Sequence, residues 1–245
     1  MRAVLFGAMR GIGRAVARVL AVRGERLFLL GRDRESLARS ARDLELRGAT
    51  APVAYAQCDL LDPDGFAAGL EAADRALDGF DTAILSAGLF APQERLESDP
   101  RLRRDLLAAD FAHSIEWCEA VRTRLLARGG GTLCVFSSVA GERGRRPVVF
   151  YGAAKAGLSR YLEALDHRYH AEGLRVVTVK PGFVRTAMTD GLEPPPFAGS
   201  AEAVARATVR ALDRGAPVVY TPGVWRAVML AVRALPRSVM RRTTF

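Results

Sequence analysis

The sequence predicts a single α/β domain with a doubly wound parallel sheet of about seven strands and helices on both faces. Short β-rich runs alternate with segments of helical periodicity from one end of the chain to the other. Most of these runs are apolar on both faces, as strands covered by helices are. The length of 245 residues is one that a single α/β domain commonly has.

The expected elements follow one another in a regular order. The first strand leads into a helix that places Ile12, Val16 and Leu20 on one face. A long helical pattern, from Leu107 to Leu125, separates the fourth strand from the fifth, and another helix follows Tyr151. The expected strands are residues 3–6, 27–30, 53–56, 82–85, 133–136, 176–179 and 218–220.

The composition excludes several classes of protein. Hydrophobic residues make up 49% and charged residues 26% of the chain, which is typical of a soluble globular protein. The first residues enter a strand without a leader, and no apolar run reaches the ~18 residues of a membrane span, so a cytoplasmic protein is expected. Cys58, Cys118 and Cys134 are scattered, which predicts buried thiols without a disulfide or a metal site.

The charge pattern gives one further clue. The net charge of +9 does not identify a partner, because the arginines are spread along the chain and no nucleic-acid-binding motif accompanies them. Of the 36 basic residues only Lys155 and Lys180 are lysines. A lysine retained in such a sequence points to a role that arginine cannot fill.

A glycine-rich turn after the first strand predicts a dinucleotide site. Gly7, Gly11 and Gly13 open the first helix, where glycines permit a tight turn and close approach of a pyrophosphate. Their G-x-x-x-G-x-G spacing differs from the common G-x-G-x-x-G and is a weak signal by itself. Met9, Arg10 and Ile12 lie within the same turn and are also expected to contact the cofactor.

The residues after the second strand bear on the choice of cofactor. Arg32 stands where a basic residue would meet the 2′-phosphate of NADP, and Arg10 can reach the same phosphate. Asp33 argues for NAD, since its carboxylate could hold the ribose hydroxyls. Alternatively, residues 32–34 are only charged residues that face solvent at the start of a helix and have no part in cofactor binding. We expect NADP(H).

The candidate reacting groups lie in the second half of the chain. Tyr151 and Lys155 are four residues apart on a helical pattern, so their head groups can converge, and Ser138 follows the fifth strand. A nearby cation is what a phenol with an ordinary pKa near 10 needs to exchange protons at neutral pH. With the glycine turn and Pro181-Gly182, this set resembles the short-chain dehydrogenase/reductase family over nearly the whole chain.

The resemblance implies a Rossmann-type fold and an NAD(P)-dependent oxidoreductase that interconverts a carbonyl and an alcohol. Tyr151 would be the general acid, Lys155 would support it and hold the nicotinamide ribose, and Ser138 would orient the substrate oxygen. Asp110 takes the place of the family's relay asparagine as the fourth member of the catalytic set. The remaining cofactor contacts that the resemblance implies are Asp59, Leu60, Ala87, Gly88, Pro181, Gly182, Val184 and Thr186.

The resemblance also suggests a substrate, partners and an assembly. Residues 183–200 would form the substrate loop, and residues 222–245 form a basic amphipathic tail that either closes a pocket or interface or lies on the inner face of a membrane. Segments 140–143 and 235–238 are similar to decaprenylphosphoryl keto-sugar (2-keto-erythro-pentose) reductases, which implies a lipid-linked keto-sugar. A soluble ketone or 3-oxoacyl group is the alternative substrate, and a non-catalytic cofactor-sensing protein is the alternative of another class. The two long helices imply a homodimer or homotetramer, and no nucleic-acid partner is expected.

Overall fold

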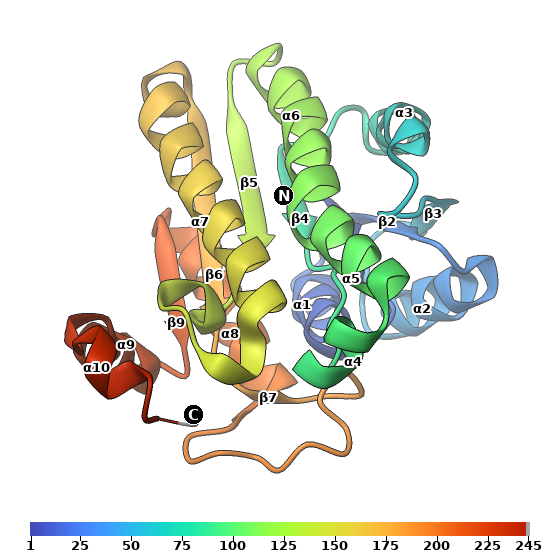
Figure 1. Ribbon diagram of the computed structural model, residues 1–245. Coiled ribbons are helices and arrows are strands. Elements are labelled where there is room, and N and C mark those ends of the chain that lie inside the picture. Colours follow the sequence, from blue (N-terminus) through green and yellow to red (C-terminus); the bar gives the residue numbers. More distant parts are fainter. Residues whose placement is uncertain (244–245) are drawn as a thin grey trace.

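The computed structural model describes residues 1–243 and confirms the predicted α/β architecture (Figure 1). One sheet of seven parallel strands has the order β3-β2-β1-β4-β5-β6-β9, so the strand order reverses between β1 and β4. In sheets of this kind, ligands bind at that reversal, outside the carboxyl ends of the strands. The strands are β1 Arg2–Phe6, β2 Arg26–Gly31, β3 Ala54–Gln57, β4 Thr82–Leu85, β5 Gly131–Phe136, β6 Leu174–Pro181 and β9 Val218–Thr221.

Helices cover both faces of the sheet, as the doubly wound pattern predicted. One face packs against α1, α2 and α8, and the other against α3, α6 and α7. These helices are α1 Gly11–Val22, α2 Arg34–Leu46, α3 Phe66–Leu77, α6 His113–Leu126, α7 Val149–Tyr169 and α8 Ala201–Arg214.

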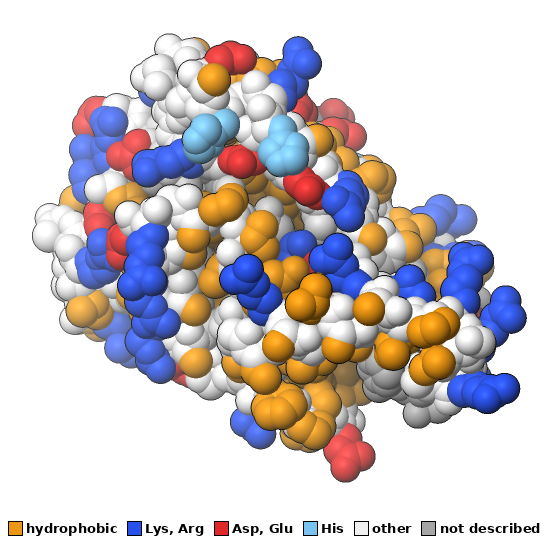
Figure 2. Space-filling view, turned by 90° about the vertical axis from the view of Figure 1, so that its left-hand side faces the viewer, with side chains coloured by type: hydrophobic (Ala, Val, Ile, Leu, Met, Phe, Trp, Pro, Cys, Tyr) orange, Lys and Arg blue, Asp and Glu red, His pale blue; other side chains and the backbone are white. Residues whose placement is uncertain are grey.

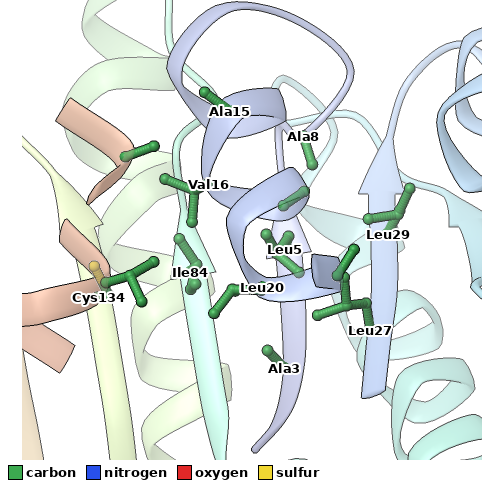
Figure 3. Close-up of a cluster of buried hydrophobic side chains, with 14 of the residues drawn as sticks. Ala3, Leu5, Ala8, Ala15, Val16, Leu20, Leu27, Leu29, Ile84 and Cys134 are labelled. Carbon is green, nitrogen blue, oxygen red and sulfur yellow. The ribbon is translucent and has the colours of Figure 1, made fainter. Parts of the chain in front are cut away.

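Alternation along the central strands divides the core in two. In β1, Ala3 and Leu5 belong to the cluster beneath α1 and α8, whereas Val4 and Phe6 point to the opposite layer. Figure 3 shows part of the first cluster, with Leu5 and Ile84 of the sheet beside Val16 and Leu20 of α1. Burial on both sides is why these strands read as continuous apolar runs.

Two predicted elements differ in detail. The expected helix from Leu107 to Leu125 consists of α5 (Pro100–Leu107), a π-helical turn η2 (Ala108–Ala112) and α6. The third strand lies at the edge of the sheet and alternates between partly buried and exposed positions, so it is not apolar on both faces.

Shorter elements surround the carboxyl ends of the strands. In Figure 1 the segment between β7 and β8 runs below the sheet, and the two C-terminal helices lie beside β9. None of the helices within residues 1–243 combines the length and the apolar character needed to cross a bilayer. The remaining elements are η1 Pro63–Gly65, α4 Gln93–Ser98, η3 Val139–Glu142, η4 Arg146–Val148, η5 His170–Glu172, β7 Val184–Arg185, β8 Gly199–Ser200, α9 Val224–Ala234 and α10 Arg237–Met240.

Candidate active site

Ser138, Tyr151 and Lys155 meet where β5 and α7 come together. Ser138 lies two residues after the end of β5 and is the N-cap of η3. Its Oγ accepts a hydrogen bond from the Ala140 amide at 3.1 Å. Tyr151 and Lys155 are one turn apart in α7, and Lys155 Nζ lies 5.8 Å from the centre of the Tyr151 ring. Against the effect of burial, the Ser138 side chain lowers the pKa of the Tyr151 phenol, which is consistent with the two side chains facing each other across β5 and α7.

Close packing fixes η3 against α7. A β-carbon on Gly141 would come within 2.7 Å of the backbone of Lys155 and Ala156, so only glycine permits this approach. Ser137 Oγ also hydrogen-bonds Lys155 O at 3.0 Å and Ser159 Oγ at 2.7 Å. These contacts hold the end of β5 at a fixed position relative to the helix that carries Tyr151.

Asp110 lies beside Lys155, which places it with the predicted catalytic set. It belongs to the π-helical turn η2, a widened turn of the kind that often occurs at functional sites. Its side chain is 0% exposed, and Oδ1 lies 3.5 Å from Lys155 Nζ and accepts a hydrogen bond from the Leu89 amide at 2.9 Å. Gly88 makes room for this pair, because a β-carbon there would be 2.6 Å from Asp110 Oδ1.

The electrostatics differ from the sequence expectation at Tyr151. We expected Lys155 to favour the phenolate, but burial, together with the charge of Asp110, raises the pKa of Tyr151, and the Ser138 side chain only partly opposes this. The physical reason is the position of the cation: Lys155 Nζ contacts Asp110 and donates to Phe136 O at 3.3 Å. Burial also raises the pKa of Asp110 itself, against the effects of Lys155 and Leu89.

The glycine turn has the shape that a dinucleotide site needs. Gly7 has φ of +100°, and a β-carbon on it would come within 2.4 Å of the Ala87 amide nitrogen. A β-carbon on Gly13 would be 2.3 Å from Ser86 Oγ. The first turn of α1 contains no acidic residue, so its free amides can face an anion. Gly11 lies against Thr186, which brings the glycine turn next to the predicted substrate loop.

A basic pocket of about 290 Å³ lies between α1 and α2. Met9 and Arg10 of the glycine turn, both predicted cofactor contacts, line it, whereas Arg32 is not among its lining residues. Sequence reasoning missed the rest of its lining, although Arg14 is one turn after Arg10 and the α2 residues have helical spacing. These further residues are Arg14, Ser36, Arg39 and Ser40.

Asp33 has a local structural role in this region. Its carboxylate accepts a hydrogen bond from the Ser36 amide at 2.8 Å and caps α2. That hydrogen bond lowers the pKa of Asp33. Arg14 Nε in the adjacent pocket is buried and has no hydrogen-bond partner within residues 1–243.

The other predicted cofactor residues lie at the same edge of the sheet, but several have side chains in other roles. Val184 is buried in the core, and Ile12 is partly buried against it. Asp59 accepts from the Leu61 amide at 3.0 Å in a turn after β3. Leu60 is buried, and its carbonyl lies 2.9 Å from His113 Nδ1. Ala87 and Gly88 lie just after β4, Pro181 is the last residue of β6, and Gly182 follows it.

The described part of the C-terminal tail packs onto the site. A cluster joins Val139, next to Ser138, to Trp225, Met229 and Val232 of α9. The apolar face that we considered for membrane contact is therefore covered by the chain itself. Residues 244–245 of the predicted tail lie outside the described residues.

Ion pairs reinforce this contact between the tail and the site. Glu142 of η3 binds Lys180 at 2.5 Å and Arg233 of α9 at 3.4 Å. Arg143 donates to Leu235 O at 2.9 Å. The second lysine of the chain therefore joins β6 to the segment that carries Ser138.

Two other predictions concern the substrate loop and the cysteines. Within residues 183–200, a cavity of about 390 Å³ is lined by residues including Phe183, Thr186 and Leu192. All three cysteines are buried and free, and burial raises the pKa of Cys58 to about 11, so these thiols are suited to packing rather than to reactivity.

Comparison with known proteins agrees with this arrangement. Residues 1–195 match the family described as short chain dehydrogenase. An uncharacterized oxidoreductase of Mycobacterium tuberculosis is 37% identical over 242 residues, covering 98% of this chain and 95% of the relative. Carbonyl reductase family member 4 of Danio rerio is 30% identical over 190 residues, 78% of each chain. A solved short-chain type dehydrogenase/reductase from Mycobacterium ulcerans has a TM-score of 0.83 at 21% identity, covering 98% of this chain and 96% of that chain, so its fold is similar.

Proposed function

This chain belongs to the short-chain dehydrogenase/reductase family, and we propose that it reduces a carbonyl compound to an alcohol with NADPH. The observation that carries the proposal is the convergence of Ser138, Tyr151 and Lys155 beside the glycine turn, at the carboxyl edge of the sheet. The similarity to a protein named a carbonyl reductase supports the direction of reaction.

The residues present fit a dinucleotide. Gly7 and Gly13 let the turn pack closely against Ser86 and Ala87, where any β-carbon would collide, and the first turn of α1 offers its backbone amides to a pyrophosphate. The basic pocket supports NADP over NAD, because Arg10, Arg14 and Arg39 surround a space suited to a phosphate. Among the described residues Arg14 Nε has no hydrogen-bond partner, while its Nη2 lies 3.5 Å from Asp43 Oδ2. A bound nicotinamide would supply the hydride.

Each residue of the triad has a defined task in this proposal. Ser138 hydrogen-bonds the carbonyl oxygen and turns it toward Tyr151. Tyr151 gives its proton to that oxygen as negative charge develops. The raised pKa of Tyr151 keeps the phenol protonated, which is the form that a general acid needs. Lys155 Nζ, 5.8 Å from the centre of the Tyr151 ring, places a positive charge near the phenol and can hold the nicotinamide ribose.

For the substrate, we propose a carbonyl group carried on a larger anionic or lipid-linked molecule, such as a lipid-linked keto-sugar. The exposed apolar side chains of the substrate loop, Met188, Leu192 and Phe197, suit a lipid chain. Arg185, which lines the loop cavity, suits a phosphate. A small soluble ketone would leave these side chains unused, whereas the chain of a 3-oxoacyl group could also contact them.

The test is NADPH oxidation with three carbonyl classes: a prenyl-phosphate keto-pentose, soluble ketones and 3-oxoacyl thioesters. We expect turnover of the first, and we expect Tyr151→Phe to abolish it while NADPH binding stays nearly unchanged. A Tyr151→Phe variant with near-native kcat would refute the triad. NADPH binding without turnover of any carbonyl would favour a cofactor-sensing protein instead.

A further inference from the structure

Glu142 and Lys180 form a buried ion pair that has no task in the reduction described above. The Glu142 side chain is 6% exposed and that of Lys180 is 13% exposed, and Glu142 Oε1 lies 2.5 Å from Lys180 Nζ. Glu142 Oε2 lies 3.4 Å from a guanidinium nitrogen of Arg233, whose side chain is half exposed. Removing one partner of a buried ion pair is costly, because the other charge is then left without compensation.

The pair joins two segments of the chain at the point where they leave the sheet. Backbone hydrogen bonds hold β5 against β6 up to the Ser137 amide, which donates to Val179 O at 2.8 Å. One segment then continues to Ser138 and η3, and the other to the predicted nicotinamide contacts that follow β6. Because Glu142 ends η3 and Lys180 is the next-to-last residue of β6, their ion pair ties the two segments together.

The same carboxylate also reaches the C-terminal helix. Arg233 of α9 donates to Glu142, and Val139 at the start of η3 packs in one cluster with apolar residues of α9. Lys180 Nζ also lies 5.6 Å from the centre of the Tyr220 ring in β9. Glu142 is therefore at a junction of η3, β6 and α9.

The opposite side of η3 is fixed by other means. Gly141 packs directly on the backbone of α7, and Ser137 Oγ hydrogen-bonds Lys155 O in the same helix. These contacts set the position of Ser138 relative to Tyr151. The ion pairs of Glu142 set its position relative to the end of β6.

We propose that Glu142 is a positioning residue for the reduction. Its ion pairs with Lys180 and Arg233 hold η3 against β6 and α9, so that Ser138 keeps a fixed place relative to the segment that would hold the nicotinamide. Glu142 itself touches neither substrate nor cofactor in this arrangement. A displacement of ~1 Å between reacting groups can lower a rate about 100-fold, so a residue that fixes their spacing controls kcat. The inference rests on the proposed function and deepens it.

The first measurement is amide hydrogen exchange, which needs no substrate. Glu142→Gln keeps the size of the side chain and removes its charge. We expect exchange in residues 138–142 and 224–234 to become at least about fivefold faster in this variant, while α2 keeps its rate. Glu71→Gln, which breaks an exposed ion pair with Arg75 on α3, is the matched control and should match wild type. Wild-type exchange of residues 138–142 in Glu142→Gln would overturn the inference.

The second measurement is steady-state reduction of the carbonyl that the wild-type protein turns over. For each chain that binds NADPH, kcat of Glu142→Gln should fall about 10–100-fold, with NADPH affinity and substrate KM nearly unchanged. Lys180→Arg keeps the ion pair and should retain far more kcat than Lys180→Met. Native kcat in Glu142→Gln would overturn the inference. A wild-type protein that turns over no carbonyl would instead refute the proposed function, and the exchange result would still test the junction.

Arg233→Gln tests whether α9 acts through the same carboxylate. We expect a smaller loss of kcat than in Glu142→Gln, and no further loss when the two changes are combined, because the bond is then already broken. Full additivity of the two losses would overturn the junction. If Glu142→Gln does not fold, Arg233→Gln and Lys180→Met decide the question: the inference requires faster exchange of residues 138–142 in both, and wild-type exchange there would overturn it.

Discussion

The indole ring of Trp225 lies directly against the main chain of Gly182, so closely that a β-carbon on Gly182 would come within 2.0 Å of Nε1. Trp225 belongs to α9, and Gly182 follows β6 at the edge where we place the nicotinamide contacts. The same ring borders the cluster around Val139. The C-terminal helix is therefore a wall of the candidate site.

This contact predicts the effect of adding one methyl group. Gly182→Ala should displace the Trp225 ring and lower the free energy of unfolding by about 1–3 kcal/mol, as overpacking does. Activity should fall as well, because the segment after Ser138 shares the cluster. Denaturant unfolding followed by tryptophan fluorescence measures the change. Gly144→Ala, where an added β-carbon meets nothing within 4 Å, is the control and should be neutral. Equal stability of both variants would contradict the packing argument.

The basic pocket predicts which arginines determine cofactor preference. Arg14→Ala and Arg39→Ala should each weaken NADPH binding by about 1.5–3 kcal/mol, the range for hydrogen bonds to charged groups, with little effect on NADH. Titrating NADPH and NADH separately into each variant measures the two dissociation constants, and their ratio gives the cofactor preference. Arg42→Ala, an exposed arginine on α2, controls for the loss of net charge.

The variant Arg32→Ala should be compared with the Arg14 and Arg39 variants in the same cofactor titration. It follows β2 at the position that the sequence indicated for the 2′-phosphate, but it is not among the residues that line the pocket. If Arg32→Ala alone narrowed the preference for NADPH, the pocket between α1 and α2 would not be the phosphate site. An NADH preference of the wild-type protein would mean that Asp33 determines the ribose contacts.

Lys155 should not be replaceable by arginine. Its Nζ lies within 3.5 Å of Asp110 Oδ1 and of the position that a β-carbon on Gly88 would take, so a planar guanidinium has no room. We expect Lys155→Arg to lose most of its kcat. Lys180→Arg should lose much less, because its partner Glu142 is a carboxylate, which arginine binds well. Native-like kcat in Lys155→Arg would show that a positive charge alone is sufficient.

The sequence predicted the strands and the glycine turn because both depend on local patterns. Apolar runs specify strands such as β1, and a turn that excludes β-carbons requires glycine at Gly7. The π-helical turn at Asp110 could not be predicted, since helical periodicity does not distinguish one widened turn. Arg14 and Arg39 were missed as a pair because their convergence depends on how α1 and α2 pack. An amphipathic pattern in the tail likewise cannot tell whether protein or lipid covers its apolar face.

Assembly remains a prediction, now with a defined surface. The chain's own core buries Cys118, Val121 and Leu125, so fewer apolar positions of the long helices are free than we expected. Leu107, Phe111 and Val149 stay exposed on α5, η2 and the start of α7, which contact one another. We expect a homodimer or homotetramer by sedimentation at micromolar concentration, weakened by Leu107→Glu. Leu46→Glu, an exposed position on α2, should change nothing. A monomeric wild-type protein would exclude this assembly.

Membrane contact through the tail requires a different test from simple truncation. Deleting α9 and α10 would uncover Val139 beside Ser138, so loss of solubility or activity would say nothing about lipid. The outward side of the tail offers Leu230, which is 71% exposed, and the exposed arginines Arg226 and Arg237. Such a surface can bind anionic headgroups while a single leucine enters the interface.

We therefore expect full-length protein to sediment with anionic vesicles at low salt and to be released as salt is raised, because screening acts within about 8 Å at physiological ionic strength. The double variant Arg226→Ser/Arg237→Ser should lose most of this binding, and Leu230→Ser part of it, while both keep their NADPH affinity. Arg34→Ser/Arg42→Ser on α2 removes the same charge from another surface and should bind vesicles normally. If wild-type protein stays in the supernatant at low salt, or if the α2 variant loses binding equally, the tail is not a membrane contact and the lipid-linked substrate loses this support.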